Sequence, residues 1–121
     1  MEPIVAPAVI AGITLLSEPL IKDAYERLKA ALMSKFGQST DLIEAVEKLE
    51  EKPDSAGRRE MLREEMVAAR VELDEDVMRA ADALLEKLKS LPEGRQVVQQ
   101  AVTGDGNVFS GTGDVTVNNN G

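Results

Sequence analysis

Hydrophobic positions between residues 18 and 90 recur three and four residues apart, which predicts a series of amphipathic helices. The pattern places helices at 18–36, 41–52, 56–71 and 75–90. The residues expected to face inward are Leu20, Ala24, Leu28, Ala31, Leu32, Leu42, Ile43, Val46, Leu49, Met61, Leu62, Met66, Ala69, Val77, Ala80, Ala81, Leu84, Leu85 and Leu88. With an apolar N-terminal helix, they predict a mainly α fold, a four- to five-helix antiparallel bundle.

The ends of these helices are marked by residues with known capping preferences. Gly37 and Pro53 follow two of the periodic stretches and are expected to end them. Side chains that can accept a hydrogen bond from the first turn precede each helix. The expected N-caps are Ser17, Ser39 or Thr40, Ser55 and Asp74.

The N-terminus carries no charge between Glu2 and Glu18, and Pro3 and Pro7 suggest a helix that becomes regular after Pro7. The apolar stretch 3–16 is shorter than the roughly twenty residues that span a bilayer. Two interpretations stay open: a helix buried in the bundle core, or a latent helix that enters a membrane when the protein assembles. The candidate membrane-active residues are Ile4, Val5, Val9, Ile10, Ile13, Leu15 and Leu16.

The composition changes at the C-terminus, where residues 96–121 contain a Gly-x-Gly-Asx turn twice, each time followed by β-forming residues. We expect a helical domain at 1–92, a hinge at 93–95 and a self-assembling segment of three short strands at 96–121. Glycines permit the turns, β-formers fill the arcs, and Asn107 ladders between copies. The candidate self-assembly residues are Val102, Gly104, Gly106, Asn107, Val108, Phe109, Gly111, Gly113, Val115 and Val117.

Three short strands cannot bury a face on their own, so this C-terminal β-arc segment must pack on the bundle or on copies of itself. Its only charges are Asp105 and Asp114, and it lacks proline. These features favour an ordered cross-β fibril. A folded β-solenoid and a disordered polar extension are the alternatives.

The composition argues against catalysis and against nucleic-acid binding. The 121 residues include no Cys and no His, which removes disulfides, thiol nucleophiles, zinc sites and the usual general base. The net charge is −8 with no basic patch. We therefore expect a non-enzymatic protein with no cofactor, no bound metal and no nucleic-acid partner.

The stretch Val102–Gly111 resembles the RHIM-like, pseudo-palindromic amyloid signalling motifs of cell-death proteins, with Val102, Gly104, Asn107 and Gly111 at comparable places. The order of parts resembles the fungal HeLo architecture and its bacterial Bell-domain analogues. This resemblance implies that a receptor with a matching motif templates the C-terminal segment. It also implies that rearrangement of the helical domain exposes the first helix to the membrane.

Two functions follow as hypotheses, both for a cytoplasmic protein of a bacterial immune or cell-death pathway that forms a homo-oligomer or fibril. In the first, the C-terminal segment polymerises and residues 4–16 act on the membrane, so the protein associates with the membrane after assembly. In the second, the segment builds a filament and the bundle recruits a partner, without membrane activity.

Overall fold

The computed structural model describes residues 4–38 and 40–103 as six α-helices and one 3-10 turn. The elements are α1 (Val5–Thr14), α2 (Pro19–Phe36), α3 (Asp41–Glu51), α4 (Ala56–Ala69), η1 (Val71–Leu73), α5 (Glu75–Lys89) and α6 (Pro92–Thr103). No strand occurs in these ranges. The mainly α fold is confirmed, and α6 is the helix that the sequence pattern did not predict.

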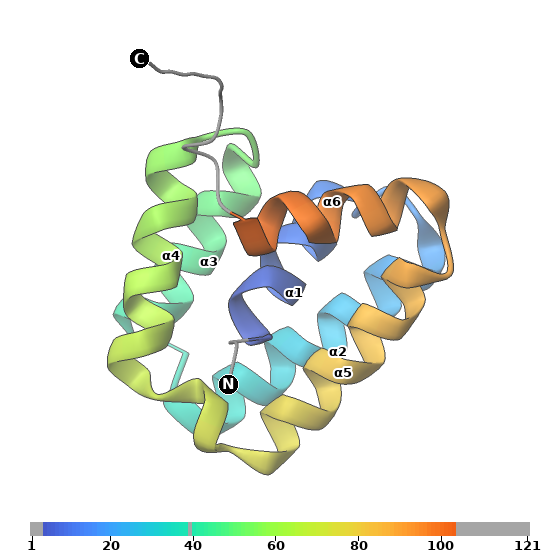
Figure 1. The fold of residues 1–121 in the computed structure, drawn as a ribbon. Helices are drawn as coiled ribbons and strands as arrows, with labels where there is room; N and C mark the ends of the chain where they lie inside the picture. Colours follow the sequence, from blue (N-terminus) through green and yellow to red (C-terminus); the bar gives the residue numbers. More distant parts are fainter. Residues whose placement is uncertain (1–3, 39, 104–121) are drawn as a thin grey trace.

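Helix α1 lies at the centre of the molecule, and the other helices surround it (Figure 1). Helices α3 and α4 form a hairpin, α2 lies against α5, and α6 crosses over α1. Helix α1 contacts each of the other five α-helices. The helices therefore enclose a central one rather than standing as a simple row of antiparallel neighbours.

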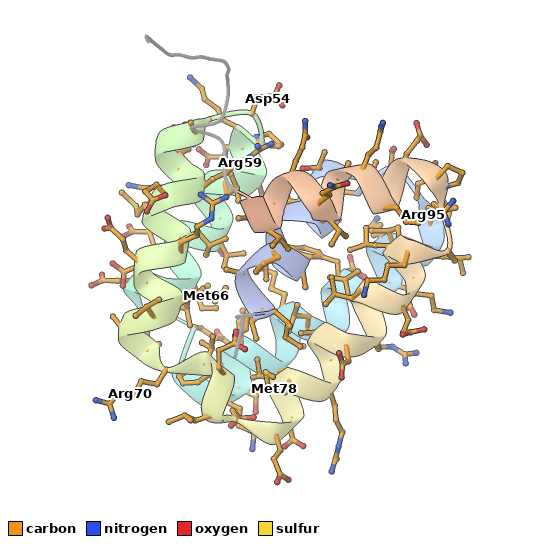
Figure 2. All side chains as sticks on the ribbon, in the orientation of Figure 1. Asp54, Arg59, Met66, Arg70, Met78 and Arg95 are labelled. Atoms are coloured by element: carbon orange, nitrogen blue, oxygen red, sulfur yellow. The ribbon has the colours of Figure 1, made fainter. Side chains whose placement is uncertain are left out.

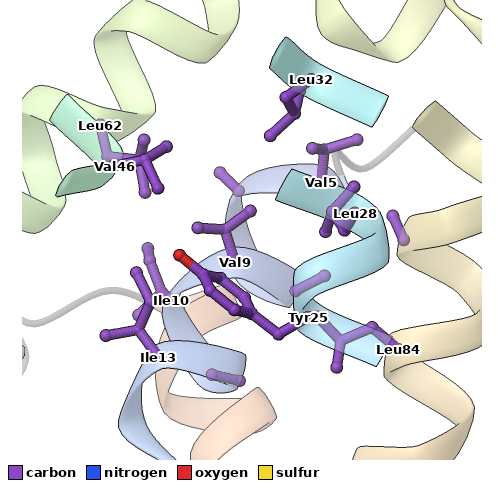
Figure 3. Close-up of a cluster of buried hydrophobic side chains, with 14 of the residues drawn as sticks. Val5, Val9, Ile10, Ile13, Tyr25, Leu28, Leu32, Val46, Leu62 and Leu84 are labelled. Carbon is purple, nitrogen blue, oxygen red and sulfur yellow. The ribbon is translucent and has the colours of Figure 1, made fainter. Parts of the chain in front are cut away.

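The nine residues from Val5 to Ile13 are all buried, so α1 supplies the centre of the core (Figure 3). The helix begins at Val5, before the expected start after Pro7, because Pro7 falls in its first turn, where a missing N–H costs no helical hydrogen bond. Gly12 allows close packing: a Cβ there would lie 3.0 Å from Leu84 Cδ2 and 3.1 Å from Tyr25 Cδ1.

Three predicted N-caps are confirmed. Thr40 Oγ1 accepts from the N–H of Ile43 at 3.4 Å, Ser55 Oγ from Arg58 at 3.2 Å, and Asp74 Oδ1 from Val77 at 3.0 Å. The N-cap of α2 is Glu18 and not Ser17, because Pro19 occupies the first helical position.

Two residues expected to face the core are exposed: Leu20 to 62% and Met61 to 44%. The buried face of α2 begins at Ile21, and that of α4 is formed by Leu62 and Met66. Each exposed residue precedes the buried face by one position, a rotation of about 100° around a helix. The hydrophobic pattern was correct in period but too wide at these two places.

The predicted hinge at 93–95 and the strand predicted from Gln96 are wrong for the described part of the segment, which forms α6. Val98 and Ala101, three residues apart, are 9% and 3% exposed and belong to the core. Burial of a helical face outweighs the weak preference of Val and Thr for strands. Residues 104–121, which hold the rest of the predicted β-arcs, lie outside the described residues.

Gly94 makes the corner between α5 and α6 possible. A Cβ at this position would lie 1.9 Å from the carbonyl oxygen of Leu88, a backbone atom that cannot move aside. The glycine therefore serves backbone-to-backbone packing and not a flexible hinge.

We expect Gly94→Ala to lower the free energy of unfolding by about 1–3 kcal/mol, because the added methyl overlaps the Leu88 carbonyl. The matched control is Gly57→Ala in the first turn of α4, where the nearest atom to a new Cβ is 4.0 Å away. That change should be neutral or stabilising. Thermal unfolding followed by circular dichroism measures both, and equal melting temperatures for the two variants would contradict the packing argument.

Candidate functional site: the central helix and the groove at its start

The structure brings the predicted membrane-active residues together on α1 and hides most of them. Val5, Val9, Ile10 and Ile13 are between 0% and 3% exposed. The flanking residues Ile4, Leu15 and Leu16 are partly buried against the same core. In this structure α1 is a core helix, as the first of the two interpretations expected. None of the helices within residues 4–38 and 40–103 has both the length and the hydropathy that a membrane crossing requires.

The N-terminus of α1 is held by a carboxylate from a distant part of the chain. Glu72 Oε2 accepts from the N–H of Val5 at 2.9 Å, and Glu72 Oε1 accepts from the N–H of Ile4 at 3.3 Å. The first N–H groups of a helix have no partner inside it, and its N-terminus carries a partial positive charge. Helix α1 has no side-chain cap and no acid in its own first turn, so Glu72 supplies both functions.

The position of Glu72 depends on the turn that leads out of α4. Arg70 has a φ of 56°, in the left-handed region that non-glycine residues seldom adopt. This conformation ends α4 and starts η1, which carries Glu72. The sequence contained a partial signal, because the start of α1 lacked an N-cap, but nothing in it indicated the distant partner.

The other end of α1 packs against a polar cluster between α2 and α3. The Tyr25 ring lies against Gly12, and its hydroxyl donates to the Glu50 carboxylate. Lys29 Nζ donates to the same carboxylate at 2.9 and 3.1 Å. Burial raises the pKa of Tyr25 well above its ordinary value, and the hydrogen bond to Glu50 and the negative charges of Glu50 and Glu47 raise it further.

An open groove of about 310 Å³ lies at the start of α1, between α4, η1 and the last turn of α6. Its walls, which are mainly apolar, are formed by Ala6, Pro7, Arg63, Met66, Val67, Val71, Glu72, Ala101 and Val102. Val67 and Val102 are 73% and 48% exposed. We call this feature the α1–α6 groove. Figure 2 shows Met66 on the inner side of α4, which faces α1 and the end of α6.

Arg63 connects the two sides of the α1–α6 groove. One guanidinium nitrogen donates to the carbonyl of Ala101 in the last turn of α6 at 3.4 Å. Another lies 3.2 Å from a Glu60 carboxylate oxygen. The positive charge of Arg63 therefore meets the partial negative charge at the C-terminus of α6.

The structure places one of the predicted self-assembly residues, and this is Val102, which lies in a helix and lines the α1–α6 groove. The other nine lie outside the described residues: Gly104, Gly106, Asn107, Val108, Phe109, Gly111, Gly113, Val115 and Val117. Within residues 4–38 and 40–103, no group of three acidic side chains is arranged to hold a metal ion.

The fold and the groove define a small all-α domain built around a buried apolar helix, with its last helix leading directly into the C-terminal segment. The chain belongs to the Het-E N-terminal domain family, whose model matches residues 1–121. This membership links it to heterokaryon incompatibility and cell-death signalling. Searches of curated proteins and of solved structures each found no match.

We expect Glu72→Ala to lower the free energy of unfolding by about 1–2 kcal/mol, because two N–H groups of α1 lose their acceptor. The control is Glu64→Ala, which removes an exposed carboxylate from α4. Urea denaturation compares the two variants. A loss of stability in both by the same amount would show that general charge, and not the cap, is responsible.

Tyr25 is the single tyrosine of the chain, so its ionisation can be followed alone by the ultraviolet absorbance of tyrosinate. Its pKa is raised in the folded protein, so the folded form keeps the proton while the unfolded form loses it above about pH 10. Stability should therefore fall as the pH rises through that value, and tyrosinate should appear only with unfolding. Tyrosinate in a protein that retains its full helical circular dichroism would contradict this expectation.

Proposed function

We propose that this protein is a non-enzymatic, self-assembling executor of cell-death signalling, in which the C-terminal segment polymerises and α1 then acts on a membrane. The observation that supports the proposal is the position of α6. Helix α6 packs on α1 and leads directly into the segment whose sequence repeats the Gly-x-Gly-Asx pattern. One continuous stretch of chain therefore joins the predicted assembly motif to the helix that would be released.

The first step is the recruitment of α6 into the assembly. Val97, Val98, Val102 and Thr103 favour strands, and their sequence pattern alone predicts one. A growing cross-β template would offer residues 96–103 an alternative set of hydrogen bonds. Their withdrawal would uncover the face of α1 that α6 contacts.

The cost of this step is compatible with such a trigger. Burying a side chain of the size of Val98 contributes about 1.5–3 kcal/mol to stability. Small domains are stable by about 5–15 kcal/mol in total. Removing α6 therefore consumes a large share of the stability that keeps α1 inside. A template that binds the segment can shift the equilibrium by that amount through mass action.

The membrane step requires more than one copy of α1. Its ten residues extend about 15 Å, half of the hydrocarbon thickness of about 30 Å. Single helices of this length would lie in the interface or thin the bilayer locally. An assembly would bring many copies to one place, and the small residues Ala6, Ala8, Ala11 and Gly12 allow close helix packing.

The second candidate function is a filament-forming scaffold, in which the bundle stays folded and recruits a partner. The complete burial of Val5–Ile13 favours this alternative, because nothing in the folded domain presents α1 to a membrane. The two functions share the assembling segment and the proposed matching receptor. They differ in the fate of α1.

Vesicle leakage tests the executor function. We expect assembled protein to release a dye from vesicles of a neutral phosphatidylcholine, and Leu16→Asp to abolish the release by placing a charge beside α1. Leu16 is only partly buried, whereas Ile10 is 1% exposed and a charge there would unfold the domain. The matched control is Leu20→Asp, which alters an exposed leucine outside α1 and should leak normally.

Gly106→Val is the control for the assembly step. This substitution should prevent fibril formation and therefore also the leakage. Electron microscopy verifies the fibrils in each sample. Fibrils of normal appearance that never release dye would exclude the executor and leave the scaffold. Leakage from protein that forms no fibrils would show that membrane activity does not depend on assembly of the C-terminal segment, and it would contradict both the executor and the scaffold.

A further inference from the structure

The α1–α6 groove presents apolar side chains that the domain core does not use. Val67 is 73% exposed and Val102 48%, while Met66 and Val71 form the floor as members of the core. Contiguous exposed apolar surface of this kind marks a binding site more often than chance. No residue of α5 lines the groove, so it is separate from the interface between α6 and α5. Its apolar walls suit an apolar ligand.

We propose that the occupant is the start of this chain's own C-terminal segment, Gly104–Phe109, with Phe109 as the anchor. Val102 is itself part of the groove, so the segment leaves α6 at the wall of the site. The six residues Gly104–Phe109 extend to at most about 22 Å, more than enough to return to a groove whose wall includes Val102, two residues before Gly104. Gly104 and Gly106 permit that reversal.

Size and polarity agree with this occupant. A phenylalanine side chain buries about 150–250 Å² and suits an apolar groove of about 310 Å³. Asp105 is the single charge of the docking segment. The groove carries one cation, Arg63, and one carboxylate, Glu72, which already accepts hydrogen bonds from the N–H groups of Ile4 and Val5.

The tether favours this occupant over a second copy or a separate partner. A short flexible connection holds a ligand at an effective concentration of about millimolar. A second copy would have to reach that concentration against the mutual repulsion of chains with a net charge of −8 each. A peptide of another protein would compete with the tethered segment, and the experiment below separates these cases.

Before assembly, docking would restrain both the C-terminal segment and α1, a consequence that rests on the proposed function. The groove includes Ala6, Pro7 and Glu72, the residues that form and hold the start of α1. A docked Phe109 would brace that end of α1 and would be withheld from the β-arcs. The same contact would restrain both the assembly motif and the membrane-active helix.

Hydrogen exchange measured by mass spectrometry on the full-length monomer tests the docking. We expect amides at 105–110 to exchange at least about tenfold more slowly than those at 115–121, because the docked part lies on the domain surface. Val67→Glu should remove this difference by placing a charge in the groove. Leu20→Glu, a substitution of another well-exposed apolar residue, on α2, should preserve it.

A second variant tests the anchor from the segment side, since Phe109→Ser should also abolish the slow exchange without altering the helical domain. Equal exchange at 105–110 and 115–121 in the unaltered protein would overturn the proposal. Slow exchange that disappears on dilution would assign the groove to a second copy and overturn it too. The readout needs neither fibrils nor vesicles, so the proposed function can fail while the docking stands, and the reverse.

Discussion

The burial of α1 is the constraint on which the rest of the structure depends. A helix without a charged side chain, in contact with all five other α-helices, cannot be replaced by any of its neighbours as the centre of the core. Each surrounding helix has an apolar face because α1 offers an apolar surface in every direction. The polar features serve the two ends of this helix: Glu72 at its start, and the Tyr25–Glu50–Lys29 cluster beside its last turn.

The sequence predicted those parts of the fold that depend on local chemistry. Thr40, Ser55 and Asp74 were recognisable as caps because each accepts a hydrogen bond from a residue three positions away. The apolar periodicity of α2 to α5 was recognisable because it, too, relates residues only three or four positions apart. The errors at Leu20 and Met61 lie at the margins of the buried faces, where one residue of rotation decides burial.

The remaining features depend on contacts between distant residues. Residues 96–103 include several strand-favouring residues, and the apolar surface offered by α1 and α5 makes a helix the better choice. Glu72 lies 67 positions from Val5, and its role depends on the left-handed conformation of Arg70. The α1–α6 groove is formed by four elements that no local pattern associates. For the candidate site, the sequence singled out α1, and it named Val102 for a different role, in a strand; it did not indicate that Glu72 and Arg63 lie beside them.

The direct passage from α6 into the C-terminal segment has a mechanical consequence. The predicted assembly motif begins at Gly104, the residue after the end of α6, so a pull on that segment would act on the last turn of α6. The first contacts under load would be the Arg63–Ala101 hydrogen bond and the packing of Ala101, followed by Val98 one turn earlier. Contacts loaded one after another yield at lower force than contacts loaded together. Helix α6 should therefore detach from α1 one contact at a time, starting at its C-terminal end. Its N-terminal end remains held at the Gly94 corner against α5.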